Sequence, residues 1–141
     1  MPTGTILELT PDGEIGHGKT RRCFVHPHNP NILIKIAGKR AQDTPPHNLL
    51  EARYYGEIRA KHGQISWIAQ VYGFVDTNIG KGLMVEAIRN ADGGLARPLA
   101  DLLDNSDRIR HWDRQKVYEA VKALVERLLP LDLRLFDLNF G

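Results

Sequence analysis

The chain has 141 residues, a length that suits one compact domain or one small lobe with part of another. Its 19 Lys and Arg residues against 17 Asp and Glu give a net charge of only +2, which argues against a nucleic-acid partner. No apolar run approaches the length that spans a membrane, and no secretion signal is recognisable. The lack of such a run predicts a protein that does not bind membranes. Because no signal is recognisable and the single Cys23 cannot form an internal disulfide, we expect a cytoplasmic location.

The first forty residues predict β-strands. Three β-prone runs cover Thr5 to Leu9, Arg22 to Val25 and Asn31 to Ala37. The second and third runs are separated by residues 26–30, a segment rich in proline and asparagine that predicts a turn. We therefore expect a β-hairpin in this part of the chain.

A helix is expected after Pro46. Asn48 is a suitable N-cap, Glu51 lies three residues later as its capping-box partner, and Gly63 supplies a stop. Three apolar residues fall on one helical face and predict its buried side: Leu50, Tyr54 and Ile58. The spacing predicts a helix of about four turns.

The rest of the chain predicts a second hairpin and then further helices. Residues 67–75 and 82–88 are typical of two strands, joined by a turn over 76–82. From Arg97 the pattern becomes helical, with a long helix from near Asp113 to Pro130 whose buried stripe consists of Val117, Val121, Leu124 and Leu128. The fold class expected is α+β, with a five-stranded antiparallel sheet and one helix, followed by helices.

Residues 13–20, GEIGHGKT, match the P-loop pattern G-x-x-x-x-G-K-[ST]. A P-loop requires a helix that begins at its lysine, because the helix N-terminus forms part of the phosphate cradle. Here the next residues are β-prone and are followed by prolines at 27 and 30, which disfavours a helix. The alternative is a glycine-rich turn between antiparallel strands, formed by Gly16 and Gly18, of the type that covers ATP phosphates in kinases.

Lys35 lies within the apolar run ILIKIA, one strand after this turn. Because burial of an unpaired ammonium is costly, we expect an acidic partner for it, Glu51 first and Glu57 second. Two simpler interpretations remain: an ordinary hairpin turn, and an edge-strand lysine whose amine reaches solvent. A metal site is not expected, because the two histidines of the turn, at 26 and 28, lack further ligands at a suitable spacing.

Several longer segments carry a family resemblance. They are GHGKTRRCFVHPHNPNILIKIA, EARYYGEIRAK, YGFVDTNIGKGLMVEAIRNADGGLARPLADLL and LRLFDLNFG. Together they resemble the YrbL family, the PhoP regulatory network proteins of bacteria, which are regarded as relatives of protein kinases. The resemblance implies a kinase-like N-terminal lobe over residues 1–88. It also implies a partial helical C-terminal lobe over 89–141 that ends at the start of the catalytic loop.

The resemblance to kinases also implies roles for individual residues. Gly16 and Gly18 would cover the phosphates of ATP, and Lys35 would contact them while paired with Glu51. Residues 86–88 would form the hinge, with backbone groups from Glu86 to Ile88 hydrogen-bonded to adenine. Asp137 aligns with the catalytic aspartate of D-x-x-x-x-N, which accepts the proton of the attacking hydroxyl. The cofactors implied are ATP and magnesium, and the phosphoryl acceptor would be a protein or a small molecule.

The sequence departs from the kinase pattern at three places. Leu135 and Phe136 replace the His-Arg that precedes the catalytic aspartate, and Arg21 replaces the third glycine of the loop. The chain ends at Gly141, before the positions of the metal-binding residues, so we expect this chain alone to be inactive as a phosphotransferase. The alternative function is a non-catalytic, pseudokinase-type regulatory or binding module.

Overall fold

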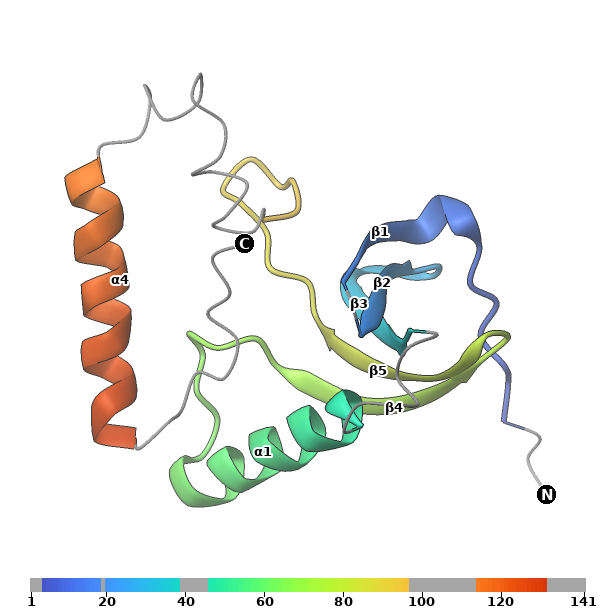
Figure 1. Cartoon of the computed structure of the whole chain (residues 1–141), viewed down its shortest axis with the longest axis horizontal. Coiled ribbons are helices and arrows are strands. Elements are labelled where there is room, and N and C mark those ends of the chain that lie inside the picture. Colours follow the sequence, from blue (N-terminus) through green and yellow to red (C-terminus); the bar gives the residue numbers. More distant parts are fainter. Residues whose placement is uncertain (1–3, 19, 39–45, 97–113, 132–141) are drawn as a thin grey trace. The chain divides into compact units, whose positions relative to one another are not determined.

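The computed structural model describes residues 4–18, 20–38, 46–96 and 114–131. It consists of two compact units, residues 1–89 and 90–141. The first unit contains, in chain order, a short 3-10 helix η1 (Pro11–Gly13), β1 (Glu14–His17), β2 (Arg21–His26), β3 (Asn29–Ala37), α1 (His47–His62), β4 (Val71–Thr77) and β5 (Gly80–Glu86). The second contains α4 (Arg114–Leu128) and the 3-10 turn η3 (Leu129–Leu131). Figure 1 labels the longer elements.

The five strands form one antiparallel sheet in the order β1-β2-β3-β5-β4, which confirms the α+β class with a five-stranded antiparallel sheet. The membership of the sheet differs from the expectation at its first strand. Thr5 to Leu9 does not form a regular strand. Instead Leu7 makes a single parallel bridge to Thr77, and the side-chain amide of Asn78 exchanges two hydrogen bonds with the backbone of Leu9. These contacts attach the N-terminal segment to the end of β4.

The two hairpins are tighter than the sequence suggests. In the first hairpin, β2 and β3 are separated by only two residues. The turn lies where the sequence predicts it, within residues 26–30, but it is shorter. In the second, β4 begins at Val71 rather than at Trp67, because the side chain of Gln70 donates to the carbonyl oxygens of Ile65 and Ile68 and holds this segment in a turn. The β4–β5 loop has two residues and is followed by Gly80, whose φ of 124° suits glycine.

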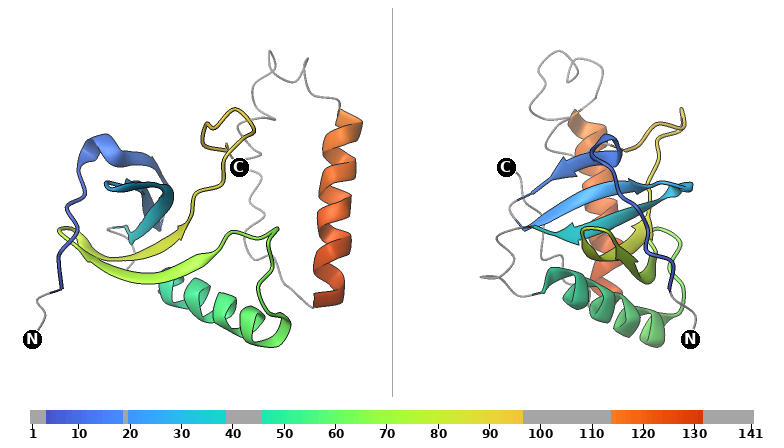
Figure 2. Two further views of the ribbon diagram at one scale, coloured as in Figure 1. Left: turned by 180° about the vertical axis from the view of Figure 1, so that it is seen from behind. Right: turned by 90° about the vertical axis from the view of Figure 1, so that its right-hand side faces the viewer.

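Alternation along the strands gives the sheet two different faces. One face carries a core cluster in which Phe24, Ile34 and Ile36 are buried with Leu9, and on the other face Leu83, opposite Lys35, is also buried. The opposite face carries Lys35, and α1 lies on that side, beneath β4 and β5 in Figure 1 and in both views of Figure 2. The position of Lys35 between two core isoleucines therefore points its amine towards the helix.

Helix α1 begins and ends close to the expected residues, but its first turn differs. Its N-cap is Pro46 without a side-chain cap, so the capping box of Asn48 and Glu51 is wrong: both side chains contact the sheet instead. Gly63 ends the helix with a φ of 73°, as expected. The face that packs inward is centred on the buried Ile58, whereas Leu50, expected to be buried, is about half exposed.

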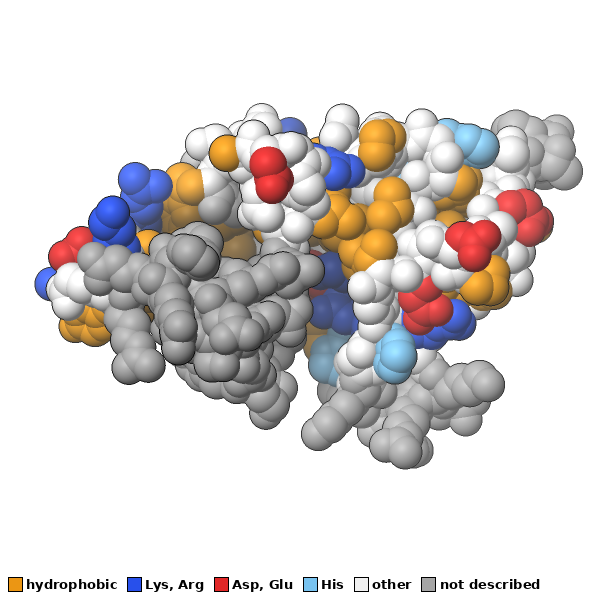
Figure 3. Space-filling view, turned by 90° about the horizontal axis from the view of Figure 1, so that it is seen from above, with side chains coloured by type: hydrophobic (Ala, Val, Ile, Leu, Met, Phe, Trp, Pro, Cys, Tyr) orange, Lys and Arg blue, Asp and Glu red, His pale blue; other side chains and the backbone are white. Residues whose placement is uncertain are grey.

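In the second unit, α4 and η3 span the long helix expected to end at Pro130. Leu128 is buried, Val117 and Val121 are half-buried, and Leu124 is exposed. Across the described ranges of the chain, no helix has both the length and the apolar character needed to cross a bilayer. Acidic and basic side chains are interspersed on the face seen in Figure 3, in keeping with the small net charge.

Candidate functional site

The sheet lysine and the helix glutamate form an ion pair. Lys35 Nζ lies 2.7 Å from Glu51 Oε1, and both side chains are about three-quarters buried. Lys35 extends from the helix-facing side of β3, and Glu51 lies one turn into α1. The expectation that Glu51 is the partner of Lys35 is confirmed. The second choice, Glu57, faces solvent and lies 3.7 Å from Arg53 on the same helix.

A second cation shares the same carboxylate. The Arg21 guanidinium, from the first residue of β2, donates to Glu51 Oε2 while Lys35 donates to Oε1. Asn48 joins the group, because its Nδ2 donates to the Lys35 carbonyl oxygen at 2.8 Å and its Oδ1 accepts from Arg21 at 3.4 Å. These four residues, here called the Glu51 cluster, carry two positive charges and one negative charge.

The cations determine the protonation state of Glu51. Burial alone favours the neutral acid and raises the pKa of the carboxyl. The charge of Lys35 and the hydrogen bonds from Lys35 and Arg21 outweigh this effect, so the pKa of Glu51 lies below its ordinary value. Glu51 is therefore ionised at neutral pH, and the cluster keeps a net charge of +1, which suits an anionic ligand.

The turn expected at Gly16 and Gly18 is shorter in the structure, because Gly16 belongs to β1, the edge strand of the sheet that contains Lys35, and only Gly18 lies between β1 and β2. Gly16 is opposite Cys23 in the β1–β2 ladder, and Cys23 is opposite Lys35 in the β2–β3 ladder. Two strand spacings, about 10 Å, therefore separate Gly16 from Lys35 along this row. Gly18 donates its N–H to the Arg21 carbonyl oxygen at 2.8 Å and closes the turn. Because residues 21–26 form a strand, the helix that a P-loop requires after Lys19 is not present, and the P-loop interpretation is wrong.

Cys23 is the residue between the turn and the lysine. Its thiol is half-buried, and burial raises its pKa against the opposing effect of the charges on Lys35 and Arg21. The thiol is therefore protonated at neutral pH and packs as a small apolar group. Its position makes it a natural reporter for a ligand bound at Lys35.

The segment expected to bind adenine follows the end of β5. The Ala87 N–H donates to the Asn31 carbonyl oxygen at 2.9 Å, so this donor is already used within the protein. The Glu86 N–H donates to the Gln70 carbonyl oxygen at 2.8 Å, and the Glu86 carboxylate accepts from the Gln70 backbone N–H at 3.0 Å. The Ile88 side chain is about half exposed.

Gln70 also connects this segment to α1. Tyr55, one turn after Glu51, donates its hydroxyl to Gln70 Oε1 at 2.5 Å. The helix that carries Glu51 and the segment at Glu86 are thus held by the same glutamine. The sequence pattern did not single out Gln70, since its role depends on contacts between segments far apart in the chain.

The remaining sequence-based expectations concern metal and catalysis. Asp137, the expected catalytic residue, lies outside the described residues, and its role stays a prediction. Within the described ranges, no group of three or more His, Cys, Asp or Glu side chains is arranged to hold a metal ion.

The fold and the cluster define a class: an α+β unit in which a sheet lysine is paired with a helix glutamate beside a glycine-containing turn. Residues 7–140 match the family described as PhoP regulatory network protein YrbL, and the chain belongs to that family. The resemblance drawn from the sequence is confirmed in this respect.

Two curated bacterial proteins are similar to this chain. Each is called "Uncharacterized protein YrbL", one from Escherichia coli (strain K12) and one from Shigella flexneri, and each is 26% identical over 106 residues. The match covers 75% of this chain and 49% of each relative, so the chain spans about half the length of the curated relatives it matches. No solved structure matches the chain.

Proposed function

We propose that the first unit binds ATP in the manner of a protein-kinase N-terminal lobe, in a bacterial protein of the PhoP regulatory network. The observation that carries the proposal is the 2.7 Å contact between Lys35 and Glu51. In protein kinases a lysine of the third strand contacts the nucleotide phosphates, and a glutamate of the following helix holds it in place. Here Lys35 lies on β3 and Glu51 lies on α1, the next helix.

The chemistry of the cluster supports a phosphate ligand. Two cations share one carboxylate, so an anion that approaches Lys35 meets a net positive charge rather than a fully compensated pair. Gly16, in the edge strand β1, lies in the same row of the sheet as Lys35, and Gly18 lies in the turn between β1 and β2. In the proposal, the backbone of the two glycines covers the phosphates while Lys35 contacts them.

Adenine would be held by the segment after β5. Since the N–H groups of Glu86 and Ala87 already donate to Gln70 and Asn31, the proposal assigns adenine binding to the remaining backbone groups from Glu86 to Ile88. Gln70 holds Glu86 through backbone and carboxylate contacts, which keeps this segment in a defined conformation.

In the proposal, phosphoryl transfer to a protein or small-molecule acceptor would use Asp137 as the base, with magnesium neutralising the phosphate charge. Glu51 is engaged by two cations and is not offered as a magnesium ligand. The second candidate is a non-catalytic, pseudokinase-type module of the same regulatory network. It is favoured by Leu135 and Phe136, which stand where protein kinases have His-Arg.

Calorimetric titration with ATP and magnesium tests the proposal. We expect binding by the unmodified chain, and at least a tenfold loss of affinity in Lys35→Met. Lys61→Met, which removes an exposed lysine from the end of α1, is the matched control and should bind as the unmodified chain does. Equal affinity of the Lys35 variant and the control would contradict the phosphate site. Turnover of ATP by the unmodified chain would favour the phosphotransferase over the non-catalytic module, whereas binding without turnover is expected of this chain under both candidates.

A further inference from the structure

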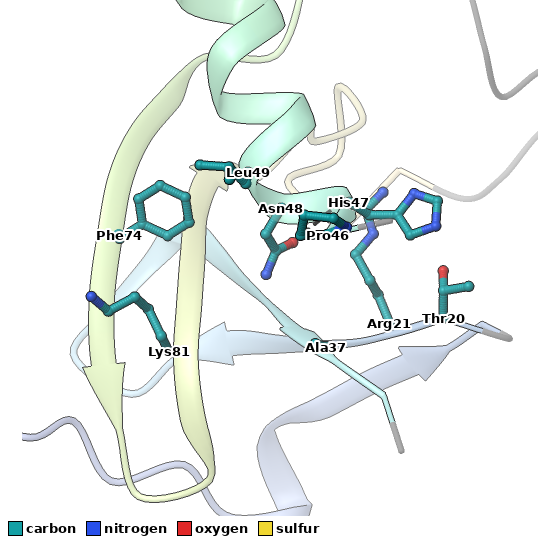
Figure 4. Close-up of a pocket in the computed structure, with 9 residues that line it drawn as sticks. All are labelled: Thr20, Arg21, Ala37, Pro46, His47, Asn48, Leu49, Phe74 and Lys81. Atoms are coloured by element: carbon teal, nitrogen blue, oxygen red, sulfur yellow. Dashed lines mark hydrogen bonds between the residues drawn. The ribbon is translucent and has the colours of Figure 1, made fainter. Parts of the chain in front are cut away.

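A pocket of about 380 Å³ lies where the first turn of α1 meets the sheet. Its walls are formed by β2, β3, the start of α1, β4 and β5, and Figure 4 shows their side chains. Lys35 and Glu51 do not line it, although Arg21 and Asn48 belong both to this pocket and to the Glu51 cluster. The pocket is therefore a neighbour of the proposed nucleotide site rather than a part of it.

The strand register explains why the pocket exists. Arg21 is opposite Ala37 in the β2–β3 ladder, and in the β3–β5 ladder Ile36 is opposite Gly82, which brings Ala37 beside Lys81. A row across the sheet thus contains two long cationic side chains with a methyl group between them. The small side chain of Ala37 forms the floor, and Arg21 and Lys81 stand on its two sides (Figure 4).

The walls above this floor are apolar and partly exposed. Leu49 of α1 and Phe74 of β4 both line the pocket, with 56% and 41% of their surfaces exposed. Tyr72, two residues before Phe74 on the same strand, is also about half exposed. Large hydrophobic side chains exposed together beside charged ones are typical of protein interaction sites.

The charge of the pocket is positive. Arg21 and Lys81 line it, and none of its described lining residues is acidic. Arg21 shares Glu51 with Lys35, and Lys81 lies 3.9 Å from Asp76 in an exposed pair of the kind that contributes little. Both cations thus keep the capacity to bind a further carboxylate.

We propose that this pocket docks a segment of a protein partner that presents carboxylates beside an aromatic or aliphatic side chain. The apolar side chain would fill the space above Ala37 between Leu49 and Phe74, and the carboxylates would bind Arg21 and Lys81. A peptide segment fits better than a small metabolite, because the apolar walls formed by Leu49 and Phe74 are themselves open to solvent rather than enclosed. The proposal does not depend on nucleotide binding.

The test uses NMR titration of the chain with an acetylated, amidated hexapeptide of alternating aspartate and phenylalanine. Two comparison probes are the same peptide with asparagine for aspartate, and 3-phenylpropionate. We expect amide shifts in the first turn of α1 and in β4. The neutral peptide should bind at least tenfold more weakly than the acidic one.

Two variants change the pocket independently, one by its volume and one by its charge. Ala37→Phe fills the floor at an exposed strand position, and Lys81→Glu reverses one charge. Each should weaken binding of the acidic peptide at least tenfold, while Lys116→Glu, an equal charge change on α4, should not. Circular dichroism checks that the variants are folded, and two independent variants keep the test valid if one of them is not.

Four results would overturn the proposal. Binding that is unchanged in both pocket variants places the peptide elsewhere, and equal binding of the neutral peptide removes the role of the cations. Tighter binding of 3-phenylpropionate than of the peptide would identify a small-molecule pocket. Absence of shifts at millimolar peptide would also contradict the docking site.

Discussion

Lys35 and Glu51 meet at 2.7 Å although they lie on different elements, and Arg21 takes the second oxygen of the same carboxylate. The arrangement joins β2, β3 and α1 through one side chain. Loss of the Glu51 charge would leave two cations close together without compensation. The position of α1 on the sheet therefore depends on this carboxylate as well as on the buried Ile58.

We predict that Glu51→Gln destabilises the protein by about 1–2 kcal/mol, because the amide keeps the shape of the side chain and removes its charge. Urea unfolding measures the change. Glu57→Gln is the matched control on the same helix, since its contact with Arg53 is exposed and should contribute less than about 0.5 kcal/mol. Equal effects of the two substitutions would show that the Glu51 cluster does not stabilise the fold.

The cluster also predicts a pH dependence. Because the folded-state pKa of Glu51 is lowered, its contribution to stability is complete above the unfolded-state pKa and is lost as the pH falls below about 4.5. Unfolding curves between pH 7 and pH 3 should therefore show the unmodified chain losing its advantage over Glu51→Gln in acid. Glu14, whose pKa is lowered by its hydrogen bond to Arg22, titrates in both proteins and cancels in the difference. If the difference in unfolding free energy between the two proteins stays constant down to pH 3, the lowered pKa of Glu51 is contradicted.

The pairing of Lys35 could be predicted from sequence because the cost of burying an ammonium demands a carboxylate, and the next helix offers one. The part played by Arg21 could not, because it follows from the register that places Arg21 opposite Ala37, and a run of strand residues does not specify its partner. Asn48 illustrates the same limit. Its local pattern indicates a helix cap, but its side chain binds the carbonyl oxygen of Lys35 from another element.

The number of strands and their antiparallel pairing could be predicted from the sequence, but the position of the first strand could not. Thr5 to Leu9 has β-prone composition, yet it does not form a regular strand of the sheet. Its Leu9 is held instead by two hydrogen bonds with the side chain of Asn78. Contacts of this kind join residues about seventy positions apart, so local propensity gives no sign of them. The strands that pair through short turns, β2 with β3 and β4 with β5, were the ones that the sequence located.

Gly82 provides a test of the core packing. A Cβ atom there would lie 2.5 Å from Ile34 Cγ2 and 2.8 Å from Ile36 Cδ1, and both isoleucines are buried. We expect Gly82→Ala to cost about 1–3 kcal/mol in the free energy of unfolding. Gly56→Ala is the opposite case, because Gly56 lies within α1 with open space around it, and alanine should raise stability by up to about 1 kcal/mol. Thermal unfolding of both variants checks the signs, and a Gly82→Ala protein as stable as the unmodified chain would contradict the packing.

The last prediction uses Cys23, the one cysteine of the chain, as a reporter on the proposed nucleotide site. Cys23 is opposite Lys35 in the sheet, and burial raises the pKa of its thiol, so we expect slow labelling by iodoacetamide at pH 8 and faster labelling at higher pH. In urea the thiol should react at the rate of a free cysteine, which gives the reference. If ATP binds at Lys35, saturating ATP with magnesium should slow the labelling of the folded chain, and this protection should disappear in Lys35→Met. Mass spectrometry of the labelled chain measures each rate, and labelling that ATP leaves unchanged in the unmodified chain would place the nucleotide away from this row of the sheet.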